Sequence, residues 1–84
     1  MEEQVTYYGL LLSGDTREHP GGLARRRVLP DGQIVEETFR KDLRWHKDDV
    51  VWEWQRGETT EQLIEITQAE AERVMERFRE TFGR

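Results

Sequence analysis

The chain has 84 residues, a net charge of −5 and no cysteine, and 35% of its residues are hydrophobic against 37% that are charged. Because a chain of this size buries only about 60–65% of the surface that its unfolded state exposes, we expect one domain over residues 1–84 with a single core that depends on a few large aromatic side chains. The acidic balance argues against general polyanion binding, and the lack of cysteine excludes disulfides and thiol catalysis.

The first residues carry neither of the usual targeting signals. Glu2 and Glu3 stand where a secretory signal would be positively charged. The apolar stretch over residues 7–12 is far shorter than the about 20 residues that a membrane-spanning helix needs. We therefore expect a cytoplasmic protein that does not engage a membrane.

Residues 4–13 favour a central β-strand, because β-formers begin the stretch and apolar side chains occupy both alternating faces towards its end. Gly9 indicates either a bulge or the close approach of a large neighbouring side chain, and packing is the better explanation. Residues 14–22 are dense in turn formers and lack a hydrophobic anchor, which predicts a long exposed loop. That loop gathers four polar side chains: Asp15, Arg17, Glu18 and His19.

Two β-type runs, residues 23–29 and 33–39, meet at a Pro-Asp-Gly turn. A type I turn with a left-handed Gly32 sets four facing pairs: Arg27–Val35, Arg26–Glu36, Arg25–Glu37 and Leu23–Phe39. A two-residue turn instead sets two arginine–glutamate pairs: Arg27–Glu36 and Arg26–Glu37. In either register, opposite charges face each other and specify the alignment, and strand alternation keeps the three arginines from forming one flat patch.

Residues 40–49 are strongly charged but include Leu43 and Trp45, which predicts an irregular crossing, with room for a short helical turn, that docks these two side chains on the core. Residues 50–55 read Val-Val-Trp-Glu-Trp-Gln and alternate in polarity. We expect a half-buried strand there, with one face formed by Val50, Trp52 and Trp54.

Residues 63–66 predict a last short strand with two inward side chains, Ile64 and Ile66. Thr67 and Glu70 then have the spacing of a capping box, which begins a helix, and Gly83 is placed to end it. An apolar stripe runs along this helix through Ala71, Val74, Met75, Phe78 and Phe82. Its width indicates a surface that faces the core, rather than a coiled-coil seam or a binding groove.

These elements predict an α+β fold, in which an antiparallel sheet of four to five strands carries the C-terminal helix on one face. The opposite face has no predicted cover. It must therefore be polar, closed by curling of the sheet, or buried against another copy or a partner.

Catalytic and metal sites find little support in the sequence. Ser13, the one serine, has His19 nearby but lacks the glycine-flanked turn of a nucleophile elbow. His19 and His46 lack the spacing of metal ligands. The carboxylate pairs at residues 36–37 and 48–49 are neighbours in the chain, so in a strand they point to opposite faces. We expect no enzymatic activity, no cofactor and no metal.

We expect an interaction or regulatory module whose partner is a protein or a second copy in a homodimer. The candidate surface combines the 14–22 loop, the arginine-rich strand and the 40–49 crossing, through Arg17, Glu18, His19, Arg25, Arg27, Arg40, Arg44, Trp45 and His46. The alternative partner is single-stranded nucleic acid, held by arginines and an exposed tryptophan. The acidic total and the facing glutamates disfavour that alternative.

Four segments carry a resemblance to known proteins: Tyr7-Tyr8, residues 17–23, Arg25-Arg26-Arg27 and Leu43-Arg44-Trp45. On these segments the chain resembles small uncharacterised proteins of high-GC Gram-positive, actinobacterial type, over most of its length. The resemblance implies a bacterial and cytoplasmic origin. It implies no activity, cofactor or site residue.

Overall fold

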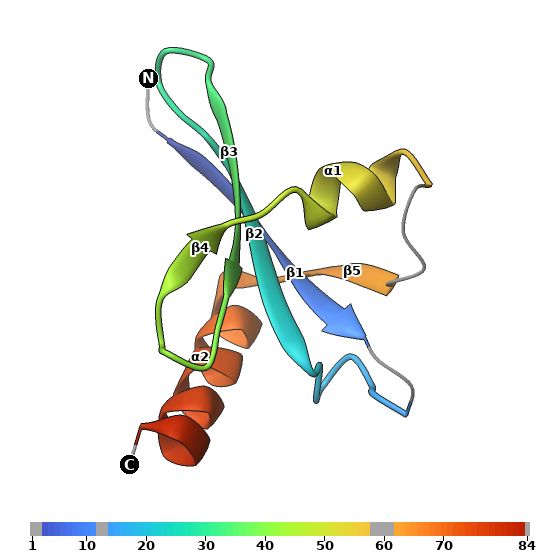
Figure 1. Ribbon diagram of the computed structural model, residues 1–84, viewed down its shortest axis with the longest axis vertical. Helices are drawn as coiled ribbons and strands as arrows, with labels where there is room; N and C mark the ends of the chain where they lie inside the picture. Colours follow the sequence, from blue (N-terminus) through green and yellow to red (C-terminus); the bar gives the residue numbers. More distant parts are fainter. Residues whose placement is uncertain (1–2, 12–13, 58–61, 84) are drawn as a thin grey trace.

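The computed structural model describes residues 3–11, 14–57 and 62–83, which form a five-stranded antiparallel sheet and two helices. The elements in chain order are β1 (Gln4–Leu11), β2 (Gly22–Val28), β3 (Ile34–Phe39), β4 (Trp45–Lys47), α1 (Val50–Gln55), β5 (Gln62–Ile66) and α2 (Gln68–Phe82). Across the sheet the strands follow the order β4-β3-β2-β1-β5 (Figure 1). The predicted α+β class, with a C-terminal helix on an antiparallel sheet, is confirmed.

Each face of the sheet buries its own apolar cluster. The cluster under α2 consists of Leu23, Phe39, Ile66, Ala71, Val74 and Phe78. The cluster under α1 consists of Tyr8, Ala24, Val50, Val51 and Leu63. Because side chains alternate along β1, Tyr7 packs against the α2 cluster and its neighbour Tyr8 lies in the α1 cluster. The face for which the sequence predicts no cover is therefore closed in part by α1, on the other side of the sheet from α2 (Figure 1).

The β2–β3 hairpin has the first of the two predicted registers. The Leu29 amide donates to the Gln33 carbonyl at 2.8 Å, and the Gly32 amide donates to the Leu29 carbonyl at 2.9 Å. Gly32 has a φ of +89°, in the left-handed region that glycine tolerates. The resulting cross-strand pairs include Arg27–Val35, Arg26–Glu36, Arg25–Glu37 and Leu23–Phe39.

Residues 50–55 form the helix α1, so the strand predicted there is wrong. Its buried side has helical spacing and consists of Val50, Val51 and the half-buried Trp54. The Asp48 carboxylate accepts from the Val50 amide at 3.0 Å. The carboxylate of Glu36, on β3, accepts from the backbone amide of Trp52. These acceptors satisfy amides of the first turn and outweigh the β preference of Val and Trp.

The predicted crossing over residues 40–49 is only partly irregular, because it ends in the edge strand β4, where Trp45 pairs with Phe39. Leu43 and Trp45 pack against the α2 cluster, as predicted. Leu43 has a φ of 65° in a tight turn, in which its amide donates to the Arg40 carbonyl at 2.9 Å. The sheet thus has five strands because residues 45–47 form β4, and residues 50–55 contribute no strand to it.

The C-terminal helix begins and ends as predicted. The Glu70 amide donates to the Thr67 hydroxyl at 3.1 Å, the Thr67 amide donates to the Glu70 carboxylate at 3.0 Å, and Gly83 is the C-cap. Ile64 and Ile66 face the α2 cluster, as expected. The stripe differs from the prediction in one respect. Phe82 is 40% exposed rather than buried in the core.

The 14–22 loop does have an apolar anchor, contrary to the sequence-based expectation, because Pro20 is fully buried. Pro20 lies over Gly9, where a Cβ atom would come within 3.0 Å of the proline Cβ. The predicted close approach at Gly9 is therefore confirmed. The Gly21 amide donates to the Leu10 carbonyl at 3.0 Å, which ties the end of the loop to β1.

Candidate ligand-binding groove

A groove of about 730 Å³ opens between the C-terminal half of α2, the start of β2 and the turn that joins β3 to β4. We call it the basic groove. Three phenylalanines form its floor: Phe39, Phe78 and Phe82. Three cationic side chains stand at its rim: Arg40, Lys41 and Arg77.

The phenylalanine floor leads from the core to the surface. The Phe39 and Phe78 rings have centroids 5.7 Å apart, and both side chains are buried. Phe78 meets Phe82 edge to face at 5.5 Å, and Phe82 is exposed at the outer end. A side chain entering the groove would therefore find apolar surface chiefly on Phe82, in a position fixed by the two buried rings.

Two of the three rim cations, Arg77 and Lys41, are held by contacts that do not neutralise their charge. The Arg77 guanidinium donates to the Pro20 carbonyl, and this neutral acceptor does not cancel the charge of the arginine. Arg40 forms an ion pair with Asp48 at 3.3 Å. The Lys41 ammonium lies 5.4 Å from the centre of the Phe82 ring, in cation–π geometry. Arg77 is held in place by Pro20, and Lys41 lies beside Phe82. A ligand in the groove could therefore contact a cation and an apolar ring at the same point.

One acidic side chain, Asp42, also lines the groove. It lies 2.7 Å from the ring nitrogen of His46, and this hydrogen bond lowers the pKa of the Asp42 carboxyl. Asp42 is thus ionised and paired. The three rim cations outnumber Asp42 and the Asp48 carboxylate that pairs with Arg40, so the rim keeps a local positive charge although the chain has a net charge of −5.

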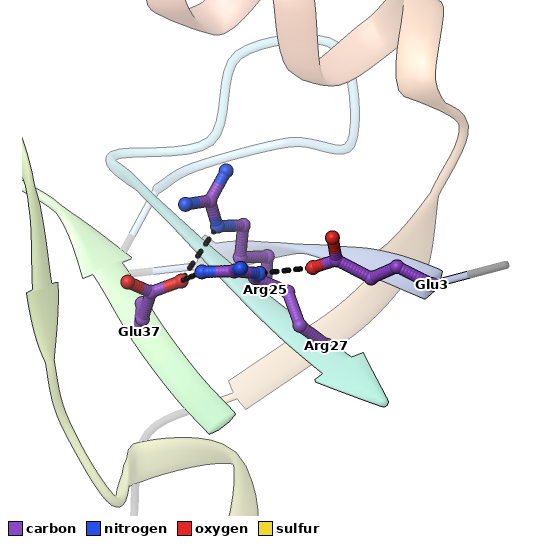
Figure 2. A network of polar contacts seen from close by, with 4 residues as sticks. All are labelled: Glu3, Arg25, Arg27 and Glu37. Atoms are coloured by element: carbon purple, nitrogen blue, oxygen red, sulfur yellow. Dashed lines mark hydrogen bonds and ion pairs between the residues drawn. The ribbon is translucent and has the colours of Figure 1, made fainter. Parts of the chain in front are cut away.

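A separate polar network lies on the α2 face of the hairpin, where Arg25 and Arg27 converge on Glu37 (Figure 2). The distances to the same carboxylate oxygen are 2.9 Å and 3.1 Å, and Arg27 also pairs with Glu3. Burial raises the pKa of the Glu37 carboxyl, but the hydrogen bonds from the two arginines outweigh it and hold the pKa below its ordinary value. The Arg25 guanidinium lies 4.0 Å from the Trp45 ring centre. These arginines therefore act as internal partners, which leaves less cationic surface for a phosphate backbone.

The predicted interaction residues fall in different places. Two line the basic groove: Arg40 and His46. Three belong to the network on the sheet: Arg25, Arg27 and Trp45. Two lie beside the first half of α2: Arg17 and Glu18. The remaining two are exposed in loops: His19 and Arg44. The structure thus divides the predicted surface among several regions.

Sequence reasoning missed three groove residues: Lys41, Arg77 and Phe82. Arg77 belongs to the polar side of the predicted helix, and only the position of Pro20 gives it a role. Phe82 is the last residue of α2, and its place in the apolar stripe predicted burial although it is exposed. The groove is assembled from three distant segments, and no local pattern encodes such an assembly.

Within the described residues, no group of three or more histidine and acidic side chains gathers to hold a metal ion. In that same part of the chain, neither helix has the length and apolarity that crossing a membrane needs. Comparisons with protein-family models, with curated proteins and with solved structures find no match for this chain.

Proposed function

We propose that the chain is a small protein-interaction module that binds an acidic segment of a partner protein in the basic groove. One observation carries this proposal: three cations stand above a phenylalanine floor on a chain whose net charge is −5. Carboxylates of the partner would lie against the rim, and an apolar side chain of the same segment would pack on Phe82. We also propose a cytoplasmic location, with which the absence of cysteine is compatible.

The binding free energy that the ion pairs and the apolar contact can each supply indicates which kind of partner fits the groove. Exposed ion pairs contribute about 0.2–1 kcal/mol each, so three of them do not hold a partner by themselves. The apolar contact with Phe82 must supply the remainder, which requires a segment with both charges and an apolar anchor. Charges at the rim of an interface mainly speed association and select among partners. We therefore expect a reversible interaction that weakens with salt.

The test is a titration of fluorescently labelled acidic peptides that contain one leucine or phenylalanine, followed by anisotropy at low and high salt. We expect binding that weakens with salt, and no binding of the same peptide with asparagine and glutamine in place of the acids. The double variant Arg40→Gln/Lys41→Gln should bind about five- to tenfold more weakly. Arg73→Gln, an exposed cation of α2 outside the groove, is the matched control and should leave binding unchanged. Equal binding by the double variant would contradict the proposal.

Two further experiments distinguish a partner protein from the other possible occupants of the groove. A single-stranded oligonucleotide that binds more tightly than the acidic peptide, and loses affinity in the double variant, would replace a protein partner with nucleic acid. Size-exclusion chromatography with light scattering tests the homodimer. A dimer that dissociates in the double variant would make a second copy the occupant of the groove.

A further inference from the structure

A second concavity, of about 440 Å³, lies on the α1 face of the sheet, opposite the network shown in Figure 2. It is lined by Arg26, Ile34, Glu36, Asp49, Trp52 and Gln55, and we call it the Trp52 pocket. None of these residues lines the basic groove. Its volume falls in the range of small-molecule sites, which is about 300–1,000 Å³.

The Trp52 pocket contains opposite charges that face each other without pairing. Arg26 and Glu36 are direct cross-strand neighbours, as Arg25 and Glu37 are on the other face. Arg25 and Glu37 form an ion pair at 2.9 Å. Arg26 Nε, in contrast, is buried and has no hydrogen-bond partner among the described residues. The Glu36 carboxylate accepts from the Trp52 backbone amide, and the charge of Arg26 acts on it without an ion pair between the two side chains among the described contacts.

The acidic side of the pocket consists of Glu36 and Asp49. Burial raises the pKa of the Glu36 carboxyl and the charge of Asp49 raises it further, although the charge of Arg26 opposes both effects. Asp49 is exposed, and as N-cap residue of α1 it makes no side-chain cap hydrogen bond within the described part of the chain. With one guanidinium and two carboxylates, the pocket needs an acceptor for the arginine and a cationic donor for the acids.

The remaining walls consist of two large hydrophobic side chains and the polar Gln55. Ile34 is 53% exposed and Trp52 is 48% exposed, and both are large hydrophobic side chains beside the charged groups. The Arg56 guanidinium lies over the Trp52 ring at 4.3 Å from its centre. An apolar ligand group would find Ile34 and the uncovered part of the indole in the same concavity. Apolar contact in the pocket therefore comes from Ile34 and Trp52, beside four polar or charged lining residues.

We propose that the Trp52 pocket binds a free α-amino acid with an apolar side chain. Its carboxylate would pair with Arg26, and its ammonium group would pair with Glu36 and Asp49. Its side chain would pack against Trp52 and Ile34. One carbon atom carries both charged groups of an amino acid, so its site needs opposite charges that are neighbours but do not touch. The Arg26–Glu36 pair provides that arrangement.

Three related ligands test separately whether the pocket recognises the carboxylate and the ammonium group. The readout is the NMR shifts of the indole and backbone signals of Trp52. L-leucine should shift these signals in a saturable way. N-acetyl-leucine lacks the ammonium group and leucinamide lacks the carboxylate, so each should bind at least about tenfold more weakly. Equal binding of leucinamide would reduce the pocket to a cation site, and equal binding of N-acetyl-leucine would reduce it to an anion site. Either result, or no binding of leucine, would overturn the proposal.

Variants of the protein provide the second test. Glu36→Gln keeps an acceptor for the Trp52 amide, and so keeps α1, but removes the charge that would bind the ammonium group. It should weaken leucine binding about tenfold. Glu53→Gln changes an exposed acid of the same helix outside the pocket and should have no effect. The groove variant Arg40→Gln/Lys41→Gln should bind leucine normally, which separates this proposal from the proposed function. Unchanged leucine binding by Glu36→Gln would contradict it.

Discussion

The two faces of the β2–β3 hairpin carry the same residue types in opposite electrostatic states. On one face, Glu37 accepts from two arginines, and its pKa is lowered. On the other face, Glu36 accepts from the Trp52 amide instead, and its pKa is raised mainly by burial. The two glutamates are neighbours in the chain. The difference therefore comes from the elements that pack on each face and not from the charge pattern of the sequence.

The same two faces also differ in their packing. The α2 face buries two phenylalanines under a helix of 15 residues. The α1 face buries a different cluster under a helix of six residues, with Tyr8 as its one buried aromatic side chain among the described residues. The α2 face thus combines the larger aromatic core with the satisfied ion network, whereas on the α1 face the buried Arg26 Nε has no hydrogen-bond partner among the described residues. We expect stability to depend mostly on the first face.

The largest expected effect comes from Phe78→Ala, which removes a buried ring from the α2 cluster. Such a truncation costs about 3–5 kcal/mol, a large share of the stability of a small domain. Urea or thermal unfolding followed by circular dichroism measures it. Phe82→Ala, in the exposed part of the same helix, is the control and should cost much less. A Phe78→Ala melt within a few degrees of the parent protein would show that the α2 face does not dominate stability.

Glu37→Gln should cost about 2 kcal/mol near neutral pH, because it leaves two half-buried arginines without their shared carboxylate. The folded-state pKa of Glu37 lies below its ordinary value of 4.5, so the carboxylate stabilises the protein above that pH. This contribution is lost as the pH falls through the folded-state pKa. Urea titrations at several pH values should therefore show the two proteins converging in acid. A constant difference at all pH values would contradict the assignment.

Glu36→Gln should raise the free energy of unfolding near neutral pH, by less than about 1 kcal/mol. The folded-state pKa of Glu36 lies above its ordinary value of 4.5, so the native state holds the proton more tightly than the unfolded state does. Stability is then lost as the pH rises from 4.5 through the folded-state pKa, and the amide avoids this loss. The same urea titrations measure the effect. A destabilisation as large as that of Glu37→Gln would show that the two faces do not differ.

Features that depend on neighbouring residues could be predicted from the sequence. The Pro-Asp-Gly turn defined two registers, and the first one is observed. The capping box at Thr67 and Glu70 set the start of α2, because both hydrogen bonds join residues three apart. The strands before and after these points followed from alternation and from their apolar content. Local chemistry was sufficient for most of the sheet and for the long helix.

Features that depend on distant residues could not be predicted. The Val-Val-Trp-Glu-Trp sequence fits a strand by alternation, but Val50, Val51 and Trp54 also fit one side of a helix, and a carboxylate from β3 helps to satisfy its first turn. The basic groove likewise needs the turn after β3 and the last turn of α2 to meet. Its cations are scattered in the sequence, where they look like ordinary surface charges.

The contact between Arg77 and the Pro20 carbonyl has a consequence for the order of folding. It joins residues 57 positions apart in a chain of 84, so its closure carries a high loop entropy and we expect it late in folding. Because Gly21 and Arg77 both line the basic groove, the groove is complete only in the native state. A ligand of the groove should therefore bind the native state alone and raise the melting temperature as its concentration rises above its Kd. Thermal-shift screening of mixed peptide and small-molecule libraries is therefore well suited to finding that ligand.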